Sequence, residues 1–75
     1  MRVFLADDSG VKAEVIAFAL VSEGLAFGVK GPGGIVNYIL TPAACEEEGL
    51  HFELEDGSLV SFDDAVKLLM KMFKE

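Results

Sequence analysis

The chain has 75 residues, of which thirteen are acidic and six basic, so its net charge at neutral pH is −7. A chain of this length makes a single domain, residues 1–75, which buries only about 60% of the surface that its unfolded form exposes. One cysteine and one histidine exclude an internal disulfide and disfavour a structural zinc site, which needs four Cys or His ligands, and we expect no metal or other cofactor.

The N-terminal part of the chain has the pattern of strands joined by turns. Residues 2–6 predict a short strand, and residues 7–10 (Asp-Asp-Ser-Gly) a turn. Residues 11–22 include good helix formers, which leaves a helix open, but their apolar side chains sort better by alternation, and we predict a long, largely buried strand. Alternation divides the apolar side chains into Ile16, Phe18 and Leu20 on one face and Val11, Ala13, Val15, Ala17, Ala19 and Val21 on the other.

A second pair of strands is predicted after the turn at Glu23-Gly24. Residues 25–30 and 35–40 are strand-forming runs on either side of Gly31-Pro32-Gly33-Gly34, which we interpret as a four-residue hairpin loop. The loop is rich in glycine, as phosphate-binding loops are. It lacks the Lys-Ser/Thr of such a loop, and no helix follows it directly.

Residues 42–48 carry the start and stop signals of a short helix. Thr41 suits the N-cap, Pro42 the first helical position and Gly49 the position beyond the end. Three glutamates near the C-terminus of this helix oppose its dipole, so it is expected to fray.

Residues 50–55 alternate between apolar and polar side chains, which predicts a strand with Leu50, Phe52 and Leu54 facing the core. Asp56-Gly57 predicts a two-residue type I′ hairpin, since both of its central positions need positive φ. The returning strand over 58–60 would place Leu59 opposite Leu54.

The last predicted element is an amphipathic helix capped by Ser61. Acidic side chains lie in its first turn and three lysines, Lys67, Lys71 and Lys74, toward its end, as the helix dipole favours. Its apolar arc is wider than the ~100° stripe of a surface helix. We therefore expect four residues of this helix to contact a partner: Leu68, Met70, Met72 and Phe73.

These elements predict an α+β fold, with strands first and a helix last. We expect a small antiparallel sheet of about four to six strands, with the C-terminal amphipathic helix packed on one face and a short helix at 42–48.

The acidic side chains are concentrated in residues 41–64, which contain no Lys or Arg. Such a segment either keeps the protein soluble or forms a docking surface that imitates nucleic-acid phosphates, as small phage-type inhibitors of nucleic-acid-handling proteins do. Direct binding to nucleic acid is disfavoured because a polyanion would be repelled. The carboxylates concerned are Glu46, Glu47, Glu48, Glu53, Glu55, Asp56, Asp63 and Asp64.

No set of residues has the spacing of a catalytic or metal-binding motif. Asp7-Asp8 and the glutamates at 46–48 lack the spaced oxygen ligands and central glycine of a calcium loop. Cys45 and His51 could act as nucleophile and base only if the fold brought them together beside an orienting group. We therefore expect a protein that is not an enzyme.

The apolar content of the chain points to a partner. Hydrophobic residues make up 52% of the chain, more than so small an interior can hide. We predict a protein-interaction module that acts as a homodimer or as an accessory subunit of a larger protein, with an acidic inhibitor and a small-molecule-binding domain as alternatives. The longest apolar run, 15–21, is far shorter than the ~20 residues that cross a bilayer, and the single free cysteine fits the cytoplasm.

Overall fold

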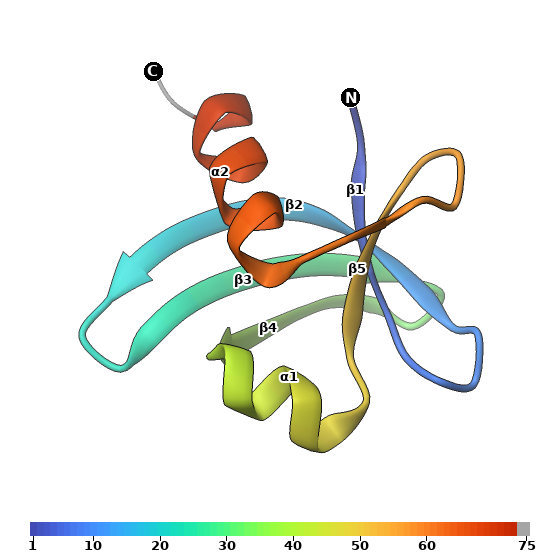
Figure 1. Ribbon diagram of the computed structural model, residues 1–75, viewed down its shortest axis with the longest axis horizontal. Coiled ribbons are helices and arrows are strands. Elements are labelled where there is room, and N and C mark those ends of the chain that lie inside the picture. Colours follow the sequence, from blue (N-terminus) through green and yellow to red (C-terminus); the bar gives the residue numbers. More distant parts are fainter. Residues whose placement is uncertain (74–75) are drawn as a thin grey trace.

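Six antiparallel strands form one curved sheet in the computed structural model, which describes residues 1–73 (Figure 1). The strands are β1 (Val3–Ala6), β2 (Lys12–Val21), β3 (Gly24–Gly31), β4 (Gly34–Leu40), β5 (His51–Leu54) and β6 (Leu59–Val60). Their order is β4-β3-β2-β1-β5-β6, so β4 and β6 are the edges of the sheet. Two helices, α1 (Pro42–Glu48) and α2 (Phe62–Met72), complete the small α+β fold that the sequence predicts.

The core lies between the sheet and the two helices, which pack on the same face (Figure 1). Phe27 of β3 is buried at its centre, with its ring centroid 5.4 Å from those of both Phe18 and Phe52. Phe62, at the start of α2, adds an edge-on contact with Phe27 at 6.3 Å. Such aromatic pairs contribute to stability beyond the area that they bury.

A β-bulge in β2 changes which of its side chains face the core. The pairing with β3 skips from Val15 to Ala17, so Ile16 is an extra residue. Val15 is buried and Phe18 packs against the core, whereas Ala17 is exposed on the opposite, outer face of the sheet. The predicted division of faces is therefore wrong, because one inserted residue inverts the alternation beyond it.

The strand β2 is also more exposed than the sequence predicts. Val15 is its only buried residue, and Leu20 and Val21 at its far end are exposed. The prediction of a largely buried strand is wrong because no second layer covers the outer face within residues 1–73, and α2 reaches only part of the inner one.

The two hairpin turns differ from their predicted forms. Gly31 and Gly34 pair with each other, so the β3–β4 turn contains two residues rather than four. In the β5–β6 hairpin only Gly57 has positive φ, and Leu54 donates its N–H to the carbonyl of Ser58. That turn therefore has three residues and not the two of a type I′ turn, and Leu59 lies opposite Glu53 instead of Leu54.

Both helices begin where the sequence predicts. The Thr41 hydroxyl accepts a hydrogen bond from the N–H of Ala44 at 3.1 Å, and the chain leaves α1 through Gly49 in a left-handed conformation. The Ser61 hydroxyl oxygen accepts a hydrogen bond from the backbone N–H of Asp64, with an N–O distance of 3.1 Å, and so caps α2. Lys71 lies in the last turn of α2, and Lys74 lies outside the described residues.

The central position of Phe27 predicts a large loss of stability on truncation. Phe27→Ala should lower the free energy of unfolding by about 3–5 kcal/mol, because it removes a buried ring and leaves a cavity. Leu59→Ala is the matched control, since Leu59 is 70% exposed and its truncation should change the free energy by less than about 0.5 kcal/mol. Urea denaturation measures both, and equal losses would contradict the assignment of the core.

Candidate functional site

The most unusual surface of the molecule is the edge strand β4. Its apolar side chains are exposed on both faces of the sheet, with Ile35 64% and Ile39 55% accessible on the outer face. Val36 and Tyr38 alternate with these residues and so lie on the helix-covered face, where they are also exposed, with 48% and 39% of their surface accessible. We define the β4 edge as these four residues together with Asn37, which lies between them and is also exposed.

The β4 edge has none of the features that usually prevent edge strands from pairing. Natural proteins protect such edges with charged side chains, proline, bulges or very short strands. Residues 34–40 contain no charge and no proline, and their register with β3 is continuous. The opposite edge, β6, has only two residues and is protected by its shortness.

Sequence reasoning missed this surface, although a signal for it was present. The run from Ile35 to Leu40 is rich in strand formers, neutral and free of proline, which is the pattern of segments that pair with other chains. The pattern does not say whether a strand lies in the middle or at the edge of a sheet. Strand order, which only the fold supplies, makes the difference.

The four predicted interface residues, three in α2 and Phe73 directly after it, are divided between core and surface. Leu68 and Met72 are half-buried, whereas Met70 is 50% exposed and Phe73 is also exposed. Ala65 and Leu69 are the buried residues of this helix. The exposed end of α2 forms one wall of an open apolar cleft of about 510 Å³, lined by Phe18, Ala19, Leu20, Met70, Lys71 and Phe73.

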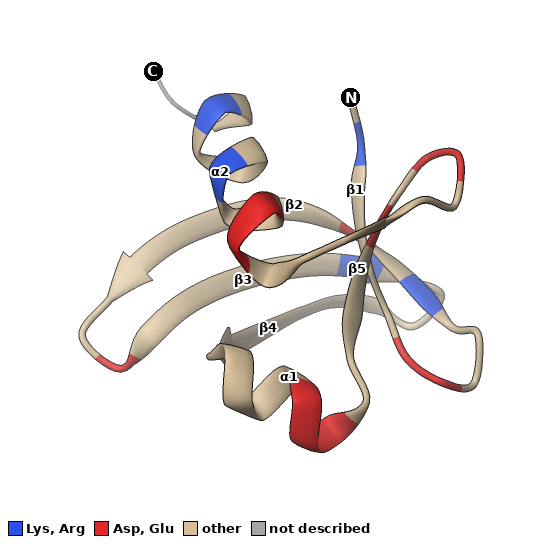
Figure 2. Cartoon of the chain, viewed as in Figure 1, with Lys and Arg blue, Asp and Glu red and all other residues tan. Residues whose placement is uncertain are grey.

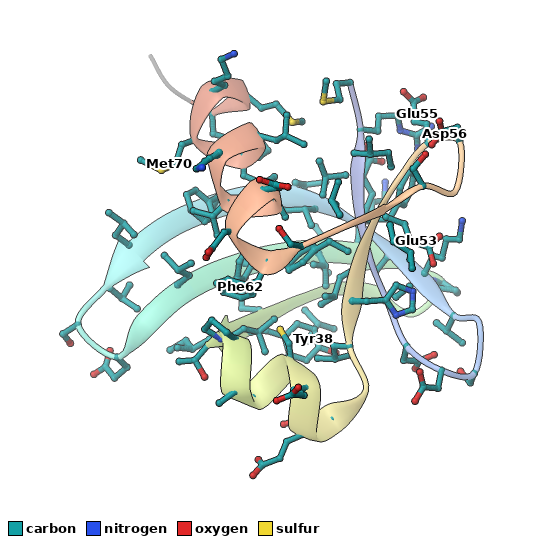
Figure 3. The ribbon with its side chains drawn as sticks, in the orientation of Figure 1. Tyr38, Glu53, Glu55, Asp56, Phe62 and Met70 are labelled. Carbon is teal, nitrogen blue, oxygen red and sulfur yellow. The ribbon has the colours of Figure 1, made fainter. Side chains whose placement is uncertain are left out.

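The acidic side chains of residues 41–64 are spread over several elements (Figure 2). Those at 46–48 lie at the end of α1, those at 63–64 in the first turn of α2, and the others along β5 and its turn. Figure 3 places Glu53, Glu55 and Asp56 on one side of the molecule and Met70 on the other. These three carboxylates and the exposed end of α2 therefore make separate surfaces.

Glu53 is engaged within the protein rather than free for a partner. Its Oε1 lies 3.0 Å from Nζ of Lys12, and its Oε2 lies 2.7 Å from Nε2 of His51. The hydrogen bond with His51, followed by that with Lys12, lowers the pKa of the Glu53 carboxyl below its ordinary value. A neighbouring pair links Arg2 to Glu14 at 3.0 Å on the same outer face of the sheet.

The geometry does not join Cys45 and His51 as a nucleophile and base. Cys45 is buried in the core, and burial raises the pKa of its thiol, which opposes formation of the reactive thiolate. The Nε2 atom of His51 faces Glu53, and no hydrogen bond links the ring to the thiol within residues 1–73. Cys45 packs there as a small apolar side chain.

No protein-family model, curated protein or solved structure matches the chain. In the described part of the chain, no helix is long and apolar enough to cross a membrane. Over the same residues, no three His, Cys, Asp or Glu side chains gather in a way that could hold a metal ion.

The lowered pKa of Glu53 predicts a pH-dependent contribution to stability. Its carboxylate stabilises the folded state above the ordinary pKa of a glutamate, and this contribution is lost as pH falls through the lower, folded-state pKa. Glu53→Gln should therefore lower Tm at about pH 5.5, and the difference from the unmodified protein should shrink toward about pH 3.

Glu47→Gln provides the control for this experiment. It removes the same charge from an exposed position of α1 that has no ion pair among residues 1–73. Its Tm should not fall at any pH, and a small rise is expected where the glutamate is ionised, because the removed charge opposes the dipole of α1. A Glu53→Gln effect that is the same at every pH would show that the charge of Glu53 is not what stabilises the fold.

Proposed function

We propose that the protein is a non-enzymatic interaction module that acts as a homodimer, with the β4 edge as its contact surface. The observation that carries this proposal is a seven-residue edge strand, Gly34–Leu40, whose apolar side chains are exposed on both faces. Pairing with another strand would satisfy its outward backbone groups and cover these side chains together. We place the protein in the cytoplasm, as its single free cysteine suggests.

The distribution of charge supports a second copy as the occupant of the β4 edge. Two copies of a chain with a net charge of −7 repel each other over most of their surface. Residues 24–45 contain no Asp or Glu, and Lys30 is the only charged residue among them. This segment includes β3 and β4, so two copies meet with the least repulsion at this side of the sheet.

A variant of this proposal is that the protein is an accessory subunit, in which the β4 edge contacts a larger protein instead of a second copy. A strand of the larger protein would then pair with β4, and the apolar cleft beside Met70 would provide a second contact. The charge distribution favours the second copy over a partner with a strongly basic surface, because the β4 edge itself is neutral.

The other functions suggested by the sequence have weaker support. An acidic inhibitor needs one contiguous negative face, whereas the carboxylates lie on several elements and Glu53 is paired with Lys12. A small-molecule site needs convergent polar groups, and Lys71 is the only charged residue among those lining the apolar cleft.

A lysine in the β4 edge should prevent dimerisation. Ile39→Lys places a charge where the proposed interface would bury an apolar side chain, and we expect association at least about tenfold weaker, equivalent to about 1.4 kcal/mol. Sedimentation equilibrium over a range of concentrations measures the association of the unmodified protein and of the variant.

Leu59→Lys is the matched control. It also replaces an exposed aliphatic side chain with a lysine, but on β6, the short strand at the opposite edge of the sheet. Both substitutions reduce the net negative charge equally, so a general change in repulsion would affect them alike. The control should remain dimeric. A monomeric unmodified protein at high concentration, or equal weakening by both lysines, would overturn the proposal.

A further inference from the structure

We infer that the two copies pair through antiparallel β4 strands related by a two-fold axis at Asn37. This inference rests on the proposed homodimer and adds its register. Ile35 of one copy then lies opposite the partner's Ile39, Val36 opposite the partner's Tyr38, and Asn37 opposite the partner's Asn37.

The β3–β4 turn determines which backbone groups of β4 are free to pair. Gly31 and Gly34 are partners across a turn of two residues. If they were a non-hydrogen-bonded pair, the two turn residues between them would have to be the next hydrogen-bonded pair, and residues adjacent in the chain cannot bond in this way. Gly31 and Gly34 are therefore a hydrogen-bonded pair. Hydrogen-bonded pairs alternate along an antiparallel ladder. The N–H and C=O groups of Ile35, Asn37 and Ile39 therefore point away from β3, toward any added strand.

An axis at Asn37 is the register that uses these outward groups fully. It places outward-pointing residues opposite one another and pairs all seven residues of Gly34–Leu40 about their middle residue. A slip by one residue would place residues whose backbone groups point outward opposite residues whose backbone groups point toward β3. A slip by two residues would keep outward groups opposite one another but would leave two residues of each strand unpaired.

The side chains of β4 are self-complementary in this register. On the outer face, Ile35 meets the partner's Ile39, and the amide of Asn37 meets the same amide of the partner. A slip by two residues would instead place Asn37 against an isoleucine and leave its amide beside an apolar side chain. On the other face, Val36 meets the partner's Tyr38, a combination of β-branched and aromatic residues that stabilises cross-strand pairs.

The unequal edges of the sheet favour a closed dimer over an open fibre. Head-to-tail growth would require β4 of one copy to pair with β6 of the next, and β6 (Leu59–Val60) has only two residues. Pairing of β4 with itself uses the long edge of both copies and leaves only short edges exposed. A two-fold symmetric interface of this kind closes on itself.

Cysteine cross-linking tests the register directly. Val36→Cys and Tyr38→Cys are made separately in a Cys45→Ala background, mixed at a concentration where the protein is dimeric, and oxidised. The proposed register brings positions 36 and 38 of different copies to a Cα separation of about 4.5 Å. Two copies of position 36, or two of position 38, are roughly 8 Å apart, beyond the ~7 Å limit for a disulfide.

We expect intact-mass analysis to show the mixed disulfide in at least about tenfold excess over the two symmetric ones, whereas random collision would give equal amounts of mixed and symmetric products. A symmetric disulfide between two copies of Val36→Cys would indicate a slip in one direction, and one between two copies of Tyr38→Cys a slip in the other. Either result would overturn the inferred register.

Asn37→Cys gives a second measurement that keeps both flanking side chains. It should form a symmetric disulfide with itself, since the two copies of this position face each other at about 5.5 Å. If the unmodified protein is a dimer but neither cross-link forms, the register is wrong and the homodimer stands. If the unmodified protein is a monomer, both proposals fail.

Discussion

A sheet of six strands has two faces and two edges, and the two helices of this protein, of seven and eleven residues, are too short to cover all of them. They pack over the part of the inner face around Phe27 and Phe52, where the core is formed. The outer face, the far end of β2 and residues 35–39 of β4 remain exposed beyond them, whereas Leu40 at the end of β4 is part of the core. The shortage of covering elements determines where the apolar surface of this protein is exposed.

The exposed apolar surface and the charge of the protein are separated in space. Carboxylates occupy both helices, the β5–β6 turn and the β1–β2 turn, while β3 and β4 carry none (Figure 2). Repulsion between two copies would therefore be weakest at the side where the apolar side chains of β4 are exposed. This arrangement would orient an encounter before any contact forms, because repulsion between like charges acts over about 10 Å.

The bulge at Ile16 contributes to the character of the outer face. Beyond it, the small side chains of Ala17 and Ala19 lie on the outer face, whereas Phe18 packs against the core and Leu20 lines the cleft at the end of α2. The outer face next to β4 therefore consists of small apolar residues, which include Ala26 and Gly28 in the neighbouring strand β3. The larger residues contribute to the aromatic core and to the cleft beneath Met70.

Features that depend on near neighbours in the chain could be predicted from the amino-acid pattern alone. Thr41, Pro42 and Gly49 mark the limits of α1, and Ser61 marks the start of α2, because a cap bonds to residues three or four positions away. Alternation identified residues 50–55 as a strand and favoured a strand for residues 11–22. That the chain has more hydrophobic residues than so small a domain can bury was also evident from its composition.

Features that depend on residues far apart in the chain could be assigned only from the folded arrangement of the strands. A bulge such as that at Ile16 exists only relative to the strand beside it, and the register of Leu59 follows from how the Asp56 turn closes. The position of β4 at the edge depends on the order of all six strands. Local pattern carries no information on strand order, so Met70 could be proposed as an interface residue from the sequence and the β4 edge could not.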